Sequence, residues 1–263
     1  MSFFDESPSK MPDAHVSELP LFPLDVVLFP GMKMSLHIFE ERYKEMVERC
    51  LAGSRLFGIV LLRGDAPAKS PRKVKTHRVG CYARIAHVER LAGGEFNLEI
   101  EGVERFRVIE QHEVEAYRTG IVEPMDDRAP VGATEEVVQD LCEEVQTLLE
   151  EFLTRQLAAL GQHIVEFDFP QNPAVLSLIT ACILPIGNPD KQSLLEGTDT
   201  AARLQTERDV LERAIARMKR GMTARPSKTK RDEETFARTD AGSDAARFVP
   251  LDAERYREYL CVN

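Results

Sequence analysis

The sequence lacks tryptophan, paired cysteines and long hydrophobic runs. Its five cysteines are widely spaced and form no C-x-x-C pair, which argues against a disulfide scaffold. The longest uncharged apolar run, Ala174 to Ile186, contains a proline and is shorter than the roughly 20 residues that span a bilayer. The chain opens on the polar text MSFFDESPSKMPD and not on a secretory signal. We therefore expect a chain without membrane contact in the reducing cytoplasm.

The motifs of common catalytic sites are also missing. A phosphate-binding loop needs glycine, lysine and a hydroxyl at fixed spacing. The nearest text, Gly53 to Gly58, is followed by Ile59 where lysine is required. The chain contains neither a G-x-S-x-G nor an H-E-x-x-H pattern. We predict that the chain is not an enzyme, with no catalytic residues and no bound cofactor.

One pair of residues has the spacing of metal ligands. His77 and Cys81 are four residues apart, so on a strand they would share a face. Two further ligands with compatible spacing are missing from the sequence. We therefore predict no metal site, and instead a surface histidine beside a buried cysteine.

Charge excludes some partners and leaves one alternative open. Acidic residues outnumber basic residues by 44 to 34, for a formal net charge of -10. This excess argues against general affinity for nucleic acids or anionic membranes, which attract clustered Lys and Arg. Arg84, Arg90, Arg105 and Arg107 could still line one side of a sheet, so RNA binding remains an alternative. The glutamates between them favour a solvated face of mixed charge.

The most organised stretch runs from Leu19 to Tyr43. Two proline-punctuated apolar segments end at Pro30-Gly31, which turns the chain. Alternating apolar residues from Met32 to Ile38 then predict a short strand. From Phe39 to Leu51 the apolar period changes to that of a helix, which Gly53 can cap.

Strand patterns continue to Pro124. They are separated by local turns, including Gly93-Gly94, whose glycines suit a hairpin. The predicted strands are Leu56–Leu62, Val74–Leu91, Glu95–Glu101, Val103–Ile109 and Val114–Val122. So many short strands in about 105 residues predict an antiparallel or mixed, partly closed sheet.

Helical patterns follow a linker at Asp126–Gly132. Asn172-Pro173 offers a capping residue and a proline permitted in the first turn before an apolar helix. The predicted helices are Thr134–Gly161, Pro173–Pro185, Pro189–Glu196 and Asp199–Arg220. Residues 1–17 read as a disordered leader and 221–247 as a flexible tail. Apolar residues return in 248–263, which we expect to be a short docking segment.

The order of these motifs resembles the N-terminal, substrate-binding domain of Lon proteases. The similar texts are LPLFPLDVVLFPG, FEERYKEMVERC, VGCYARI, EGVERFRV, NPAVLSLITACILP and DKQSLLEGTDTAARLQTERDVLERAI. The resemblance implies an α+β fold, with a PUA-like β-barrel lobe at 18–124 and a helical lobe at 133–220. No stretch is similar to the Ser-Lys protease domain of that family.

The resemblance implies a non-catalytic module that binds polypeptide segments, as an adaptor for a protease or chaperone. Met32 and Met34 are the candidate contact residues, because methionine adapts to varied apolar partners. Packing of both residues in the core is the alternative, and the sequence does not decide between them. A peptidase-associated enzyme subunit is a further alternative to the binding module.

Overall fold

The computed structural model describes residues 17–63, 75–112, 116–128, 133–159, 161 and 167–223. The predicted leader and tail lie outside this part, apart from Ser17 at the start of a strand and 221–223 at the end of a helix. The predicted docking segment 248–263 also lies outside it. The elements are β1 (Ser17–Leu24), β2 (Lys33–Ile38), α1 (Glu41–Ala52), β3 (Leu56–Leu62), β4 (Thr76–Arg90), β5 (Phe96–His112), β6 (Arg118–Pro124), α2 (Glu135–Ala159), α3 (Pro173–Ile183), α4 (Asn188–Glu196) and α5 (Thr200–Thr223).

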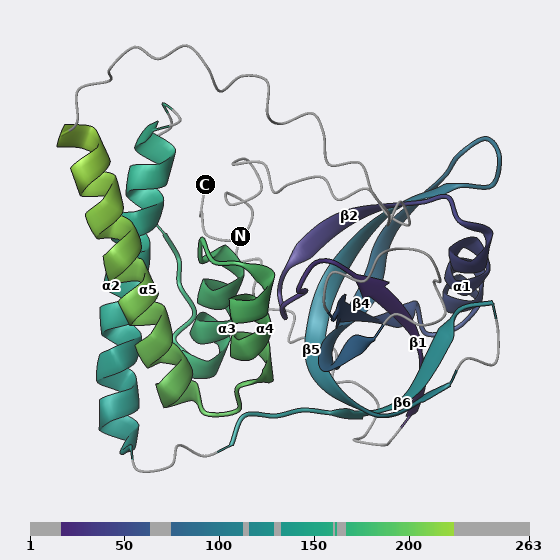
Figure 1. Cartoon of the computed structure of the whole chain (residues 1–263), viewed down its shortest axis with the longest axis horizontal. Helices are drawn as coiled ribbons and strands as arrows, with labels where there is room; N and C mark the ends of the chain where they lie inside the picture. The colour runs from purple at the N-terminus through teal and green to yellow at the C-terminus, as the bar shows by residue number, and fades with distance from the viewer. Residues whose placement is uncertain are drawn as a thin grey trace.

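The six strands form one mixed sheet. Their order is β2-β5-β4-β3-β1-β6, and β6 pairs with β5 as well. β1 runs parallel to β3, and every other pair is antiparallel. β5 is 17 residues long, so its first half pairs with β2 and its second half with β6. The sheet therefore curves back on itself (Figure 1).

This pairing corrects the prediction of a β-barrel. Strands β1, β3, β4, β5 and β6 pair in a ring, but β2 continues the sheet beyond that ring. The sheet as a whole is therefore not a closed barrel. It is a curved mixed sheet within an α+β fold.

Gly102 explains a second difference from the sequence prediction. We predicted that this glycine separates two strands, but both segments belong to the single strand β5. Its N–H donates to the Met32 carbonyl and its own carbonyl accepts from Gly31, each at 2.8 Å. A Cβ at this position would overlap the Phe29 carbonyl. Glycine is thus needed for close approach of the turn at Pro30-Gly31, and not to end a strand.

A small hydrophobic core fills the inside of the curved sheet. It consists of Leu19, Leu21, Val60, Tyr82, Phe106, Val108 and Val122. Phe106 packs edge-on against Tyr82, with ring centroids 4.9 Å apart. Gly58 and Gly80 on neighbouring strands make room for Phe106, because a Cβ at either would lie 2.6 or 2.7 Å from its ring.

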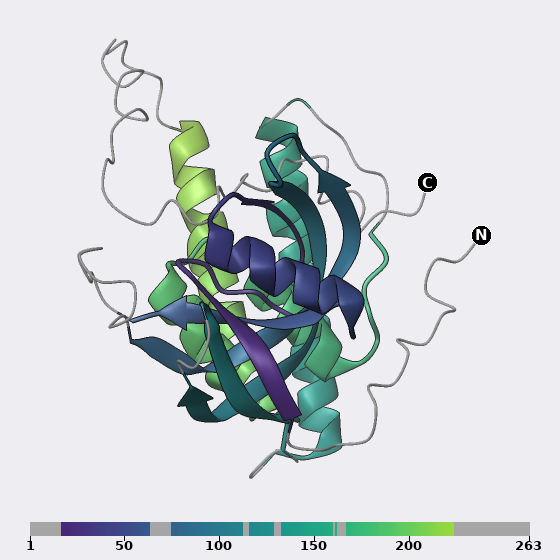
Figure 2. The ribbon, with the colours of Figure 1, turned by 90° about the vertical axis from the view of Figure 1, so that its right-hand side faces the viewer.

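The larger core extends from the sheet into the helices. Helix α1 lies across the sheet (Figure 2) and buries Tyr43, Met46, Val47 and Cys50. The long helices α2 and α5 lie side by side, with α3 and α4 between them and the sheet (Figure 1). Buried residues from the sheet and from these helices form one continuous cluster. The division into lobes at 18–124 and 133–220 stays a prediction.

The helix that follows Asn172 begins as predicted. The Asn172 side chain accepts hydrogen bonds from the N–H groups of Ala174 (2.9 Å) and Val175 (3.2 Å), and Pro173 occupies the first turn. These bonds satisfy amides that have no partner within the helix, which fixes where α3 starts. Within the described ranges, none of the helices combines the length and hydrophobicity that a bilayer crossing requires.

Candidate functional site at the junction of sheet and helices

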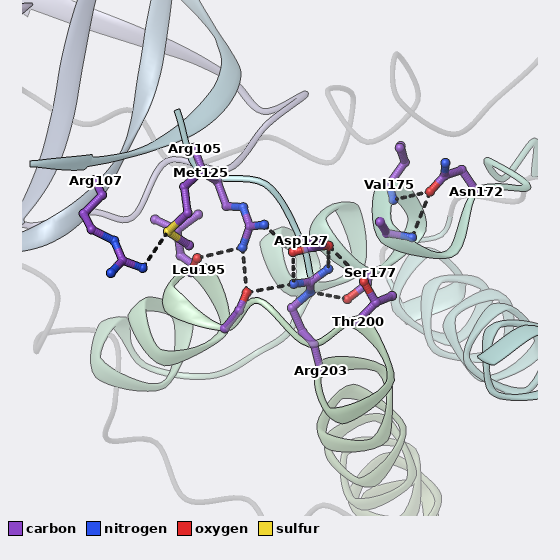
Figure 3. Close-up of polar contacts among 12 residues, drawn as sticks. Arg105, Arg107, Met125, Asp127, Asn172, Val175, Ser177, Leu195, Thr200 and Arg203 are labelled. Carbon is purple, nitrogen blue, oxygen red and sulfur yellow. Dashed lines mark hydrogen bonds and ion pairs between the residues drawn. The ribbon is translucent and has the colours of Figure 1, made fainter. Parts of the chain in front are cut away.

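Two buried arginines share one aspartate where the helices meet the sheet (Figure 3). Arg105 comes from β5 and Arg203 from α5, and they are 4% and 2% exposed. Asp127 lies in the segment after β6 and pairs with Arg105 through Oδ1. Arg203 donates to both carboxylate oxygens, at 3.1 and 2.7 Å, and the Thr200 hydroxyl donates to Oδ2 at 2.9 Å. One carboxylate thus connects the sheet to α5.

Both guanidiniums also donate to backbone oxygens, and Arg203 donates to a hydroxyl. Arg105 donates to the carbonyl oxygens of Leu195 (3.1 Å) and Gly197 (2.6 Å) at the end of α4. Arg203 also donates to Gly197 (3.0 Å), and its Nε donates to the Ser177 hydroxyl on α3 (2.6 Å). The junction therefore ties β5, α3, α4 and α5 together. These hydrogen bonds are all made within the chain, so we interpret the junction as a positioning element and not as a ligand site.

The electrostatics agree with that interpretation. Burial by itself would raise the pKa of Asp127, but the hydrogen bonds and charge of Arg203 oppose it. With the charge of Arg105 and the Thr200 hydroxyl, they hold the pKa below its ordinary value. Asp127 is therefore ionised at neutral pH, as the two guanidiniums require.

A serine and a glutamate lie behind Arg203, inside the helical part. The Ser177 hydroxyl donates to Glu207 Oε1 at 2.8 Å, and both side chains are fully buried. A serine beside a carboxyl has the composition of a nucleophile and a base. Full burial, however, separates this serine from any polypeptide at the surface. The pair therefore has no direct route to a substrate.

Several cysteines of the described part are held as thiols. Burial raises the pKa of Cys50 and of Cys182 to about 11, and it raises the pKa of Cys81 and Cys142 as well. A thiol with a raised pKa contains little of the reactive thiolate at neutral pH. These four residues therefore lack the electronic activation of a catalytic cysteine.

The structure decides the question that the sequence left open for Met32 and Met34. Their exposed fractions are 6% and 2%, and both belong to the large core. Met34 lies opposite Ile100 of β5, on the side of the sheet that faces this core. The proposed contact surface at these two residues is therefore wrong. The alternative of core packing is what the structure shows.

The other sequence candidates do not form a site in the described residues. His77 pairs with Glu196 of α4 at 2.9 Å, and Cys81 is buried. Across the part of the chain that the structure describes, no group of three or more acidic, His or Cys side chains is arranged to hold a metal.

The suspected stripe of arginines is also divided. Arg105 is buried in the junction, and Arg107 donates to the Met125 sulfur at 3.6 Å. Arg90 pairs with Glu48 at 3.4 Å. Arg105 is therefore removed from any basic surface, and Arg90 shares its charge with a glutamate.

Sequence reasoning missed three exposed hydrophobic side chains. Ile109 on β5, Val137 at the start of α2 and Val175 at the start of α3 are 47%, 46% and 46% exposed. The exposure of Val137 could have been predicted, because this residue precedes the periodic inward positions that begin at Val138.

The curved sheet and the helices form an α+β fold that is also found in solved structures. A Lon N-terminal domain protein from Xanthomonas campestris is similar in fold, with a TM-score of 0.52 and 24% identity over 73% of this chain and 96% of that chain. The N-terminal domain of Mycobacterium avium complex Lon protease gives a TM-score of 0.57 and 20% identity over 74% and 98%.

The chain belongs to the family of the ATP-dependent protease La (LON) substrate-binding domain, which it matches over residues 18–213. It is 31% identical over 196 residues to a Lon protease of Syntrophus aciditrophicus, covering 71% of this chain and 24% of the relative. It is 24% identical over 202 residues to a Lon protease of Heliobacterium modesticaldum, covering 76% and 24%. The chain thus spans about a quarter of the length of these relatives.

Proposed function

We propose that this chain binds segments of other polypeptides without cutting them and presents them to a protease or chaperone. The observation that carries the proposal is the match of residues 18–213 to a substrate-binding domain family. The matched relatives are named as proteases, but the similarity covers only 24% of their length. Binding is therefore the activity to carry over to this chain, and cleavage is not.

The proposed contact surface lies at the N-terminal ends of α2 and α3. Val137 and Val175 are exposed there, although each has a large apolar side chain. Glu135 and Glu136 stand beside Val137 in the first turn of α2 and give it a polar rim. Apolar contact surrounded by polar groups is the usual composition of a reversible protein interface.

A binding assay with a permanently unfolded polypeptide tests both the binding of polypeptide segments and the proposed contact surface. We expect fluorescently labelled, reduced and alkylated casein to bind the wild-type chain and to keep its intact mass. Val137→Glu and Val175→Glu should weaken binding. Ile109→Glu is the matched control, because this residue is equally exposed but lies on the sheet.

Each outcome has a separate meaning. If wild-type protein does not bind the polypeptide, the proposed function is wrong. If it binds and all three variants bind equally well, the function stands and the contact surface is wrong. Degradation of the polypeptide by a preparation of this chain that contains no contaminating protease would contradict a non-catalytic role.

A further inference from the structure

Arg203 lies between two carboxyl groups, and only one of them belongs to the junction with the sheet. On one side its two Nη atoms donate to Asp127. On the other side its Nε donates to the Ser177 hydroxyl (2.6 Å), which in turn donates to Glu207 Oε1 (2.8 Å). Glu207 follows Arg203 by four residues on α5, so both side chains lie on the same face of that helix.

Glu207 is fully buried, and one of its oxygens is left without a hydrogen bond. Among the described residues, neither Glu207 Oε2 nor the buried Thr180 hydroxyl on α3 has a partner. An ionised carboxylate in such a place is strongly disfavoured, because a buried charge needs bonds that replace water. Burial accordingly raises the pKa of Glu207 well above its ordinary value. The Ser177 bond and the charge of Arg203 act against this rise, and Asp127 adds to it.

The charged and titratable groups around Glu207 come from each packed element. Arg203 on α5 and Asp127 after β6 are the charges that act on it, with Arg105 of β5 beyond Asp127. From α2, Cys142 faces it as a neutral thiol whose own pKa is raised by burial. Helix α3 contributes the Ser177 hydroxyl. Arg203 is thus the cation that acts on Glu207, and the Ser177 hydroxyl connects the two side chains.

We infer that protonation of Glu207 sets how firmly Arg203 holds Asp127, and so how firmly the helices hold the sheet. With a neutral Glu207, the guanidinium interacts with one anion, Asp127. With an ionised Glu207, the same guanidinium is attracted toward a second anion through Ser177. The junction then loses part of its ion pairing, because one cation is divided between two carboxylates.

The raised pKa of Glu207 decides whether stability rises or falls with pH. The folded chain keeps its proton on Glu207 at pH values where the unfolded chain has lost it. The stabilisation is therefore complete below the ordinary pKa of a glutamate, and it is lost as the pH rises from there through the raised pKa. Over this interval the folding equilibrium constant should fall by up to about tenfold per pH unit for one proton.

Hydrogen exchange at the junction tests the inference in the full chain. The amides of Met125 and Arg128 bond to the carbonyls of Arg105 (3.0 Å) and Thr198 (2.8 Å), so they report opening of the junction. We compare wild type with Glu207→Gln, which stays neutral, and take the ratio of exchange rates at each pH so that intrinsic exchange cancels. Glu212→Gln, an exposed change on the same helix, is the control.

The expected ratio of wild type to Glu207→Gln is about one below the ordinary pKa of a glutamate. From there up to the raised pKa of Glu207 it rises by up to about tenfold per pH unit, and above the raised pKa it levels off. The ratio of wild type to Glu212→Gln should stay near one throughout. A ratio for Glu207→Gln that is flat with pH would overturn the inference.

A second measurement needs no variant, in case Glu207→Gln does not fold. The carboxyl carbon of Glu207 can be followed by NMR in the wild-type chain, together with the amides of Met125 and Arg128. We expect all three signals to change in one step, above the pH at which exposed carboxyls titrate. The inference is wrong if Glu207 titrates with the exposed carboxyls, or if the two amides do not follow it.

Discussion

Replacing Asp127 by asparagine should destabilise the chain by several kilocalories per mole. Arg105 and Arg203 are almost fully buried and share this carboxylate. Asparagine keeps the shape, but it removes the charge and turns an acceptor into a donor that faces other donors. Removing one partner of a buried ion pair typically costs about 3–5 kcal/mol. Carbonyl bonds to Leu195 and Gly197 remain, so we expect about 3 kcal/mol, the lower end of that range.

Urea unfolding is the assay for Asp127→Asn. A loss of about 3 kcal/mol is large against a total stability of roughly 5–15 kcal/mol, so the midpoint should fall clearly. The slope of the free energy of unfolding against urea concentration should not change, because the variant exposes the same surface on unfolding. Glu150→Gln, on the exposed face of α2, is the control and should stay within about 0.5 kcal/mol of wild type. A loss below about 1 kcal/mol for Asp127→Asn would refute the reasoning, because it would mean that the guanidiniums do not depend on the carboxylate.

The same variant predicts a change at acid pH. Because the pKa of Asp127 is lowered in the folded chain, its stabilisation is complete above the ordinary carboxyl pKa of about 3.9. It is lost as the pH falls from there through the lowered value. Wild type should therefore lose stability over this interval relative to Asp127→Asn. Parallel curves for the two proteins would contradict the assigned role of the arginines.

Three further predictions follow from local packing. Gly80→Ala should lower the free energy of unfolding, measured with urea, by about 1–3 kcal/mol or more, because the new Cβ would overlap the backbone of β3. Gly187→Ala is the control and should lower it little, because the nearest neighbour of its Cβ would lie at 3.6 Å. Asn172→Ala should cost about 1 kcal/mol by removing the cap of α3, and an unchanged midpoint would contradict the cap. Cys50 should react with iodoacetamide about a hundredfold more slowly in the folded chain than after unfolding, because its pKa is raised to about 11; equal rates would contradict its burial.

Much of the fold could be predicted from neighbouring residues. The alternating residues of β2, the helical face of α1 and the cap at Asn172 each depend on side chains within a turn or two of one another. The family motifs follow the same order as these elements, and the family is confirmed over residues 18–213. Prediction was wrong where a local signal had a distant cause: Gly102 was read as a strand end, but it makes room for the Phe29 carbonyl.

The exposed apolar residues were harder to predict, because exposure is not a local property. Met32 and Met34 have the chemistry of an adaptable surface, yet pairing of β2 with β5 places both in the core. Val137 and Val175 have the chemistry of core residues, yet they are exposed. Composition alone does not separate these two cases, since the same apolar side chain serves in either.

The sequence by itself determined most of the secondary elements, their order and the family. These follow from hydrophobic period, proline and glycine placement and caps, which act over a few residues. Only the tertiary structure decided which charges meet. Asp127 was part of a predicted linker, and its partners Arg105 and Arg203 are 22 and 76 residues away. Ion pairing between such distant residues leaves no periodic signal in a single sequence, because it arises only when folding buries all three side chains together.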